Sequence, residues 1–155
     1  MIVSKTDLKG KITYANRVFL RVSGYDKKEL IGAPHNILRH PNMPRAVFKL
    51  LWDTLQKEKE IFAYVLNRCR NGDHYWVLAH VTPSWDNGDH VVAYHSNRRL
   101  PERKAVEQIS SIYNNLLAIE QKHSSPKDGL DASLRALHEL LQQKGMPYEQ
   151  FVLSF

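Results

Sequence analysis

Two Asn-Gly pairs, Asn71-Gly72 and Asn87-Gly88, constrain the fold of this chain more than any other feature. Each pair is flanked by aromatic or β-branched residues. Asn-Gly favours tight hairpin turns because both central residues of such a turn need a positive φ. The sequence therefore predicts three consecutive antiparallel strands, roughly at residues 61–70, 73–84 and 89–97.

The first thirty residues predict a second hairpin followed by short helices. Ile2–Leu8 and Lys11–Ala15 have the apolar and β-branched content of two short strands. Asn16 then stands where a helix N-cap belongs, and Gly24 ends that helix. A second brief helical turn is expected over Asp26–Ile31.

A longer helix is expected after a proline-rich loop, because Pro44 suits the first turn of a helix. Its apolar residues form one broad face, made of Val47, Phe48, Leu50, Leu51, Trp52 and Leu55. Two strands, a group of short helices and three strands describe an α+β domain. We expect this domain to span residues 1–100 and to end near Leu100-Pro101.

Residues 101–155 predict a C-terminal helical annex, a term used below for this segment. Gly145 closes its second helix, and Pro147 opens a final helical turn. Three apolar seams follow helical spacing: Val106-Ile109-Tyr113-Leu116, Leu130-Leu134-Leu137-Leu141 and Tyr148-Phe151-Val152-Phe155. These seams must be buried against the sheet, a second copy of the chain or a partner.

The positive charge is confined to the N-terminal domain. The formal net charge is +6, and the annex contributes six Lys/Arg against seven Asp/Glu, so the first hundred residues carry +7. The Lys and Arg residues are scattered, with no block of five or more, which argues against a nucleic-acid partner. A positively charged pocket for an anionic cofactor explains the excess better.

The remaining composition indicates a cytoplasmic, non-catalytic protein. No apolar run approaches the roughly 18 residues needed to span a membrane, and the N-terminus lacks the apolar stretch of a signal peptide. The single cysteine, Cys69, has no partner for an internal disulfide and is expected to be a structural thiol. No catalytic motif is present, so we expect no enzyme activity.

Two stretches carry a specific resemblance. The first contains Arg39-His40-Pro41-Asn42-Met43-Pro44, and the second runs from Asn67 to Trp76 and includes Asn71-Gly72-Asp73-His74-Tyr75-Trp76. With Gly24-Tyr25, they resemble the sensory PAS domain of the aerotaxis receptors over roughly residues 2–99. That resemblance implies the PAS fold, with a cofactor cleft between the helices and the five-stranded sheet, and noncovalently bound FAD whose redox state is read.

Arg39 is the candidate phosphate anchor, because a guanidinium binds phosphate through planar, bidentate donors. His35 and His40 lie in the same loop. Their spacing and the single cysteine do not supply the three or four ligands of a zinc site. Heme needs one axial histidine, which His80 or His95 on the strands could provide.

Other candidate residues come from the aromatic and amide side chains. Trp52, Tyr75 and Trp76 either wall a flat isoalloxazine ring or belong to the core. In the resemblance, Asn16 and Asn67 occupy positions where polar side chains meet the cofactor. Read without it, Asn16 is an N-cap and Asn67 a polar strand residue.

Two positions depart from the family pattern. Asn42 replaces the acidic residue of the family loop, and Ile61 replaces a tryptophan near the flavin. Both affect what the resemblance implies about affinity and redox potential.

The resemblance implies a redox sensor for aerotaxis or energy taxis. Its expected partner is a membrane chemoreceptor or the HAMP and signalling module of one, and the annex could also form a homodimer. Two alternatives stay open on the sequence alone: a heme-based gas sensor and a cofactor-free PAS interaction module.

Overall fold

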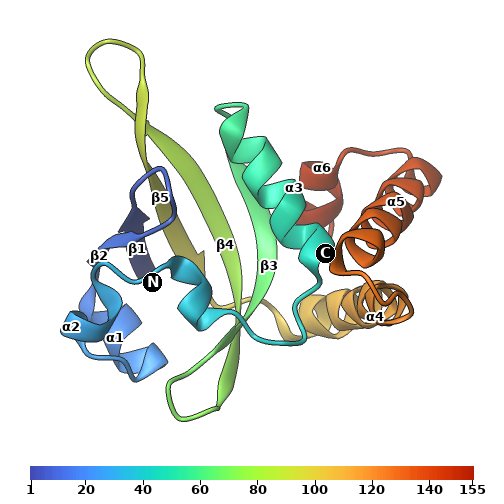
Figure 1. Cartoon of the computed structure of the whole chain (residues 1–155), viewed down its shortest axis with the longest axis horizontal. Helices are drawn as coiled ribbons and strands as arrows, with labels where there is room; N and C mark the ends of the chain where they lie inside the picture. Colours follow the sequence, from blue (N-terminus) through green and yellow to red (C-terminus); the bar gives the residue numbers. More distant parts are fainter.

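The strands form one antiparallel sheet with the spatial order β2-β1-β5-β4-β3 (Figure 1). The computed structural model describes all residues, 1–155. The strands are β1 (Ile2–Thr6), β2 (Ile12–Ala15), β3 (Ile61–Arg68), β4 (His74–Trp85) and β5 (Val91–Arg99). Both predicted sets of strands are present, and β1 joins them by pairing with β5. The α+β class with a five-stranded antiparallel sheet is confirmed.

Three short helical segments and one longer helix follow β2: α1 (Arg17–Ser23), α2 (Lys27–Leu30), the 3-10 helix η1 (His35–Leu38) and α3 (Arg45–Gln56). α1 begins as predicted, because the Asn16 side chain accepts a hydrogen bond from the Phe19 amide at 3.0 Å. It ends at Gly24, whose φ of 76° is the left-handed conformation that terminates helices. The helix η1 falls inside the loop that the sequence analysis left without regular structure.

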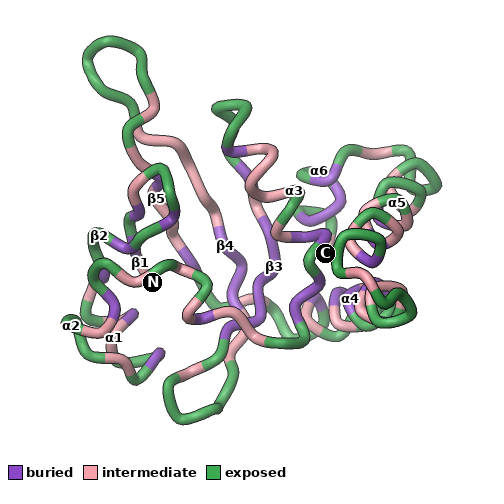
Figure 2. The backbone as a smooth tube through the Cα atoms, viewed as in Figure 1, coloured by how far each residue is buried: buried purple, intermediate pink, exposed green.

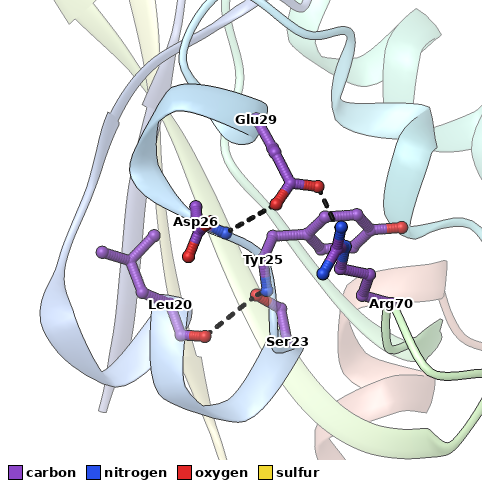
Figure 3. Close-up of polar contacts among 6 residues, drawn as sticks. All are labelled: Leu20, Ser23, Tyr25, Asp26, Glu29 and Arg70. Carbon is purple, nitrogen blue, oxygen red and sulfur yellow. Dashed lines mark hydrogen bonds and ion pairs between the residues drawn. The ribbon is translucent and has the colours of Figure 1, made fainter.

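Two side chains join α2 to the turn between β3 and β4 (Figure 3). The Glu29 carboxylate accepts from the Asp26 amide at 3.4 Å and pairs with Arg70 Nε at 3.0 Å. The Arg70 amide donates to the Ser23 carbonyl at 2.8 Å, which ties the same turn to the end of α1. α1 and α2 are thus held against the end of the sheet where the β3–β4 turn lies.

The two hairpin turns are wider than the Asn-Gly pairs predict, and the expected pair of positive φ angles is wrong in both. Only Gly72 in the first turn and only Asp89 in the second has a positive φ. Side chains close these loops instead: Asn71 Oδ1 accepts from the Asp73 amide at 3.0 Å, and Asp86 Oδ1 accepts from the Gly88 amide at 2.8 Å. The side chain of Asn71 in the first turn and of Asp86 in the second therefore closes the loop by bonding the backbone two residues on.

The register of β3 against β4 assigns their side chains to two faces. Asn67 pairs with Tyr75 on one face, while Leu66 pairs with Trp76 on the other. Cross-strand partners share a face because side chains alternate along a strand. We call the face carrying Asn67 the helix face, since α3 covers it, and the other the annex face.

The annex consists of α4 (Arg103–Gln121), α5 (Pro126–Lys144) and α6 (Tyr148–Leu153). α6 packs on the edge strand β3, while α5 packs on both α4 and α3, so the annex reaches around that edge of the sheet (Figure 1). The residues of its apolar seams are buried or half-buried within the same chain (Figure 2). None of the helices combines the length and hydrophobicity needed to cross a membrane.

An aromatic cluster joins the annex to the sheet. Tyr113 Oη of α4 donates to the Tyr64 carbonyl of β3 at 2.6 Å, and the Tyr113 and Trp76 rings lie 5.9 Å apart. Phe155 meets the edge of the Tyr64 ring at 6.1 Å. Part of the sheet is thus covered on both faces, which explains the nearly continuous burial of β3.

Candidate functional site

A cavity of about 590 Å³ lies between the helix face of the sheet and α3. β1, β3, β4 and β5 form its floor, α3 forms a wall, and the segment from Pro34 to Arg39 contributes another side. The floor residues alternate along the strands: Ser4, Thr6, Val65, Asn67, Ala79, Val81, Tyr94, Ser96 and Arg98. Five of these nine are polar, counting the serines, Thr6, Asn67 and Arg98, which is unusual for the interior of a small domain.

Arg98 is the most informative residue of the cavity. Its side chain is buried, with 2% of the residue exposed, yet no carboxylate pairs with it. Its guanidinium donates to His35 Nε2 at 2.7 Å and to Ser4 Oγ at 2.9 Å, and it lies 4.5 Å from the centre of the Phe19 ring. Burial lowers the pKa of Arg98 to about 10, so it remains a cation near neutral pH.

His35 holds Arg98 as a neutral acceptor. Burial, with the positive charge of Arg98 adding to it, lowers the pKa of His35 to about 3. Because a guanidinium only donates, His35 Nε2 must carry the lone pair and Nδ1 the proton. The ring nitrogen that faces the cavity is therefore already occupied by a hydrogen bond.

Three buried polar atoms on the helix face make no hydrogen bond of good geometry: Arg98 Nε, and Asn67 Nδ2 and Tyr75 Oη, whose side chains interact with each other. Asn67 lines the cavity, and Tyr75 is its cross-strand neighbour. Burying such a group without a partner costs about 1–3 kcal/mol, and native proteins contain few of them. Their concentration here indicates that the cavity accommodates a ligand with polar atoms on its edge.

Further cations stand around the cavity. Lys9, Arg45 and Lys49 line it from exposed positions, and Arg39 lies with its guanidinium 4.2 Å from the centre of the Phe48 ring. Lys49 pairs with Asp53 at 2.8 Å, whereas Lys9, Arg39 and Arg45 form no ion pair. Burial and the charge of Arg45 lower the pKa of Arg39. The net positive lining favours an anionic ligand.

Two aromatic rings, set nearly perpendicular to each other, give the cavity an aromatic surface. Trp52 of α3 and Tyr94 of β5 both line it and meet edge to face, with centroids 5.7 Å apart. Gly10 lies against the Trp52 ring, where an added Cβ would come within 3.2 Å of two ring carbons. Such a surface can stack on a planar ligand.

Four of the residues predicted from the sequence meet in this cavity: His35, Arg39, Trp52 and Asn67. Asn16 does not belong to it. Its Oδ1 accepts from the Val3 and Phe19 amides, and its Nδ2 donates to the Met1 carbonyl, so its hydrogen bonds serve the α1 cap. Tyr75 faces the same side as Asn67 but stands outside the lining.

The other predicted residues lie elsewhere. His40 Nδ1 accepts from the amide of the exposed Asn42 at 3.0 Å, and neither residue lines the cavity. Ile61 is buried at the start of β3, also outside the lining. Trp76 lies on the annex face against Tyr113, so its interpretation as a wall of the ring site is wrong, because alternation along β4 directs it away from the cavity.

The remaining metal and thiol candidates also point away from the cavity. His80 stacks on Phe62 on the annex face and pairs with Glu60 at 2.9 Å, and His95 contacts Asn97 on that face. No three His, Cys, Asp or Glu side chains form a metal-binding group. Cys69 Sγ donates to the Val22 carbonyl at 3.3 Å, so no thiol faces a ligand in the cavity.

The sequence analysis missed Arg98, Tyr94 and Ser96, although their signal was present. The three occupy alternate positions of β5, and a strand that places Tyr, Ser and Arg on its inward face is unlike a core strand. It also missed the rim cations and Leu130 of α5, which lines the cavity from the annex. Those positions depend on how helices pack, and no local pattern reveals them.

Comparison with known protein families matches residues 12–97 to the PAS fold. The chain is 42% identical to the aerotaxis receptor of Escherichia coli over 117 residues, covering 76% of this chain and 23% of the receptor. It is 32% identical to the nitrogen fixation regulatory protein of Klebsiella pneumoniae over 81 residues, covering 52% of this chain and 16% of that protein. The chain thus spans about a quarter or less of these relatives.

Solved structures agree on the fold. A light-oxygen-voltage domain studied with a flavin analogue superposes with a TM-score of 0.65 at 19% identity, covering 74% of this chain and 87% of that domain. The dark structure of the blue-light photoreceptor aureochrome1 LOV gives a TM-score of 0.61 at 25% identity, covering 77% and 86%. The expected fold is confirmed.

Proposed function

Because the chain belongs to the PAS family, we propose that its cavity binds a flavin noncovalently, that this flavin is FAD, and that the protein senses redox state rather than catalysing a reaction. The resemblance to the aerotaxis receptor and the light-oxygen-voltage domains supports the flavin class. The cavity supports it independently, because it combines aromatic side chains with an unpaired buried cation.

Arg98 is the observation that carries this proposal. A buried guanidinium without a carboxylate is costly to fold, since a charge removed from water needs an opposite charge or a full set of hydrogen bonds. Two of its donor groups are used, and Nε is free. An electron-rich ligand edge would supply the missing acceptor.

The cations that line the cavity from its rim favour FAD, the dinucleotide form of flavin, over FMN. FAD carries a pyrophosphate, and Arg39, Arg45 and Lys9 place three positive charges without an ion pair around one cavity. Guanidinium groups bind phosphate through paired donors. Arg39 also keeps the role that its sequence position implies, because it lies at the cavity and forms no ion pair, although the nearby charge of Glu120 acts on it.

A bound flavin would supply reversible electron uptake, which changes the charge of the ring. Arg98 is placed to stabilise negative charge in the cavity, and His35 keeps Arg98 oriented without carrying a proton itself. Asn67 Nδ2 offers a further donor on the floor. A change in the ring's charge would thus act on residues of β5, β3 and the segment before α3.

The signalling context is a proposal drawn from the relatives. The similar receptor is named for aerotaxis, and this chain spans only part of such proteins. We infer that the chain works in the cytoplasm with a membrane chemoreceptor or a HAMP and signalling module. The annex would be one element available to contact that partner or a second copy of the chain.

An absorption spectrum of the freshly purified chain tests the proposal first. A flavin doublet is expected, and denaturation followed by chromatography should release FAD rather than FMN. Protein purified without ligand should take up FAD on titration. A heme Soret band, or a folded protein that binds no flavin, would contradict the proposal and favour the gas sensor or the cofactor-free module.

A further inference from the structure

The first turn of α3 is capped from the annex. The residue before it, Pro44, provides no side-chain cap. Instead, the Arg45 amide donates to Glu120 Oε1 at 2.9 Å and the Ala46 amide to Glu120 Oε2 at 3.3 Å. Free amides at a helix N-terminus favour a carboxylate, and this one comes from the far end of α4.

The same carboxylate also binds the next annex helix. Ser133 Oγ of α5 donates to Glu120 Oε2 at 2.6 Å. One turn earlier, Gly129 lies so close to the α4 backbone that an added Cβ would stand 2.7 Å from the Glu120 carbonyl oxygen. Only glycine permits this approach, so α3, α4 and α5 meet at one point.

This junction adjoins the cofactor cavity. Arg45, whose amide Glu120 caps, also lines the cavity, and so does Leu130, the residue after Gly129. α3 further contributes Phe48 and Trp52 to the same lining. The annex therefore touches the cavity directly through Leu130 and indirectly through the wall that Glu120 holds in place.

We propose that the annex completes the cofactor site, with Glu120 as the positioning residue that fixes α3 and Leu130 as part of the wall. Ligand binding and annex docking then favour each other. The inference rests on the proposed flavin binding. Coupling between two equilibria is reciprocal, so a docked annex strengthens FAD binding by the same factor by which FAD strengthens docking.

Full-length variants test this coupling. Glu120→Gln keeps the size of the side chain but removes its charge, and Glu107→Gln is the matched control, because Glu107 lies on the same helix with 68% of its side chain exposed. We expect Glu120→Gln to weaken FAD binding about fivefold or more, and Glu107→Gln to leave it unchanged. FAD should also slow amide exchange in α5 of the wild type, and do so less in Glu120→Gln.

A second pair of variants tests the direct contact of Leu130 with the cavity. These variants keep the inference testable if Glu120→Gln does not fold. Leu130→Ala shortens a residue of the cavity wall, and Leu134→Ala removes an equally half-buried leucine of α5 that does not line it. The inference predicts weaker FAD binding for the first variant only. A purely structural annex predicts the same affinity for both, at temperatures where both are folded.

The outcomes separate the two proposals. Wild-type affinity in both Glu120→Gln and Leu130→Ala, with α5 exchange unaffected by FAD, would overturn the coupling and leave flavin binding intact. A wild-type chain that binds no FAD would refute the flavin proposal and this inference together. Weakened binding in Leu130→Ala but not in Leu134→Ala would support the inference even if Glu120→Gln does not fold.

Discussion

The two faces of the sheet are built from the same strands but are buried for different reasons. On the helix face, Asn67 and Arg98 are buried beside a cavity, and each has a polar atom without a partner. On the annex face, Trp76 and Leu66 pack against the annex, where Tyr113 donates its hydroxyl to the sheet backbone. The helix face keeps a cavity with unpartnered polar atoms, whereas the annex covers the other face.

This difference shows which sequence features indicate binding. Aromatic residues occur on both faces, so their presence on a strand does not identify a cofactor site. Buried polar residues at alternate strand positions occur only where the cavity lies. On the annex side the buried hydroxyls belong to Tyr113, which donates to the sheet backbone, and to Tyr148 of α6, which makes no hydrogen bond of good geometry. An unpaired buried cation occurs only on the helix face. The four predictions that follow test this contrast.

The largest effect should come from the annex face. Trp76→Ala removes a ring packed on Tyr113, and loss of a large aromatic contact of this kind lowers the free energy of unfolding by about 3 kcal/mol. Chemical denaturation measures it, with the 48% exposed Trp85→Ala as the control. FAD affinity of the folded variant should not change. A weakened FAD complex in fully folded Trp76→Ala would break the division between the faces.

Arg98→Met should have the opposite effects: weaker FAD binding without a loss of stability. Removing the buried cation should weaken FAD binding about 100-fold, because hydrogen bonds to a charged group contribute about 1.5–3 kcal/mol. The ligand-free protein should be as stable as the wild type or more so, since an unpaired buried charge no longer has to be desolvated. Arg99→Met is the control, because Arg99 is the exposed neighbour on the same strand. A clear loss of stability without ligand would contradict this account.

His35 predicts a pH dependence of folding. Its pKa is about 3 in the folded chain and 6.5 ordinarily, so between these values the unfolded chain binds more protons and stability falls as the pH decreases. From pH 6.5 to 5 the loss should be about 1.6 kcal/mol. Urea titrations at both pH values should show this loss reduced in His35→Asn and retained in the exposed-site control His138→Asn. If the free energy of unfolding fell by the same amount in all three proteins, His35 would not titrate as proposed.

The smallest effect is expected at the rim. Arg39→Ala should weaken FAD binding about tenfold with little change in fold, because a partly exposed phosphate contact contributes about 1.4 kcal/mol. The affinity for FMN, which lacks the pyrophosphate, should fall less in Arg39→Ala. Arg68→Ala removes an exposed cation that does not line the cavity and controls for net charge. Equal losses for Arg39→Ala and Arg68→Ala would mean that the rim acts only through its overall potential.

The order of the elements could be predicted from the sequence because it depends on local signals. Asn16 and Gly24 mark the ends of α1 by hydrogen-bonding and backbone preferences that operate within a few residues. The hairpin turns were misjudged because the Asn71 and Asp86 side chains bond the backbone two residues on and so form wider loops. The strands were still placed within about three residues, because their hydrophobic pattern does not depend on the turn.

The sequence analysis named cavity residues in the loop, on α3 and on β3. Arg39, Trp52 and Asn67 were found because the resemblance or their residue type drew attention to them. Trp76 was misplaced because the two faces of a strand cannot be assigned to helices or annex before the sheet register is known. Leu130 and Glu120 approach the cavity from over 80 residues beyond Arg39, through packing of the annex that no local pattern encodes.

The pairing of a neutral His35 with a charged Arg98 also bears on what kind of signal such a cavity can report. The first group would gain a proton only near pH 3 and the second would lose one only near pH 10. Across the whole range in which cells live, the pair keeps a single charge state. These two side chains would therefore add no pH response of their own to a sensor built around them.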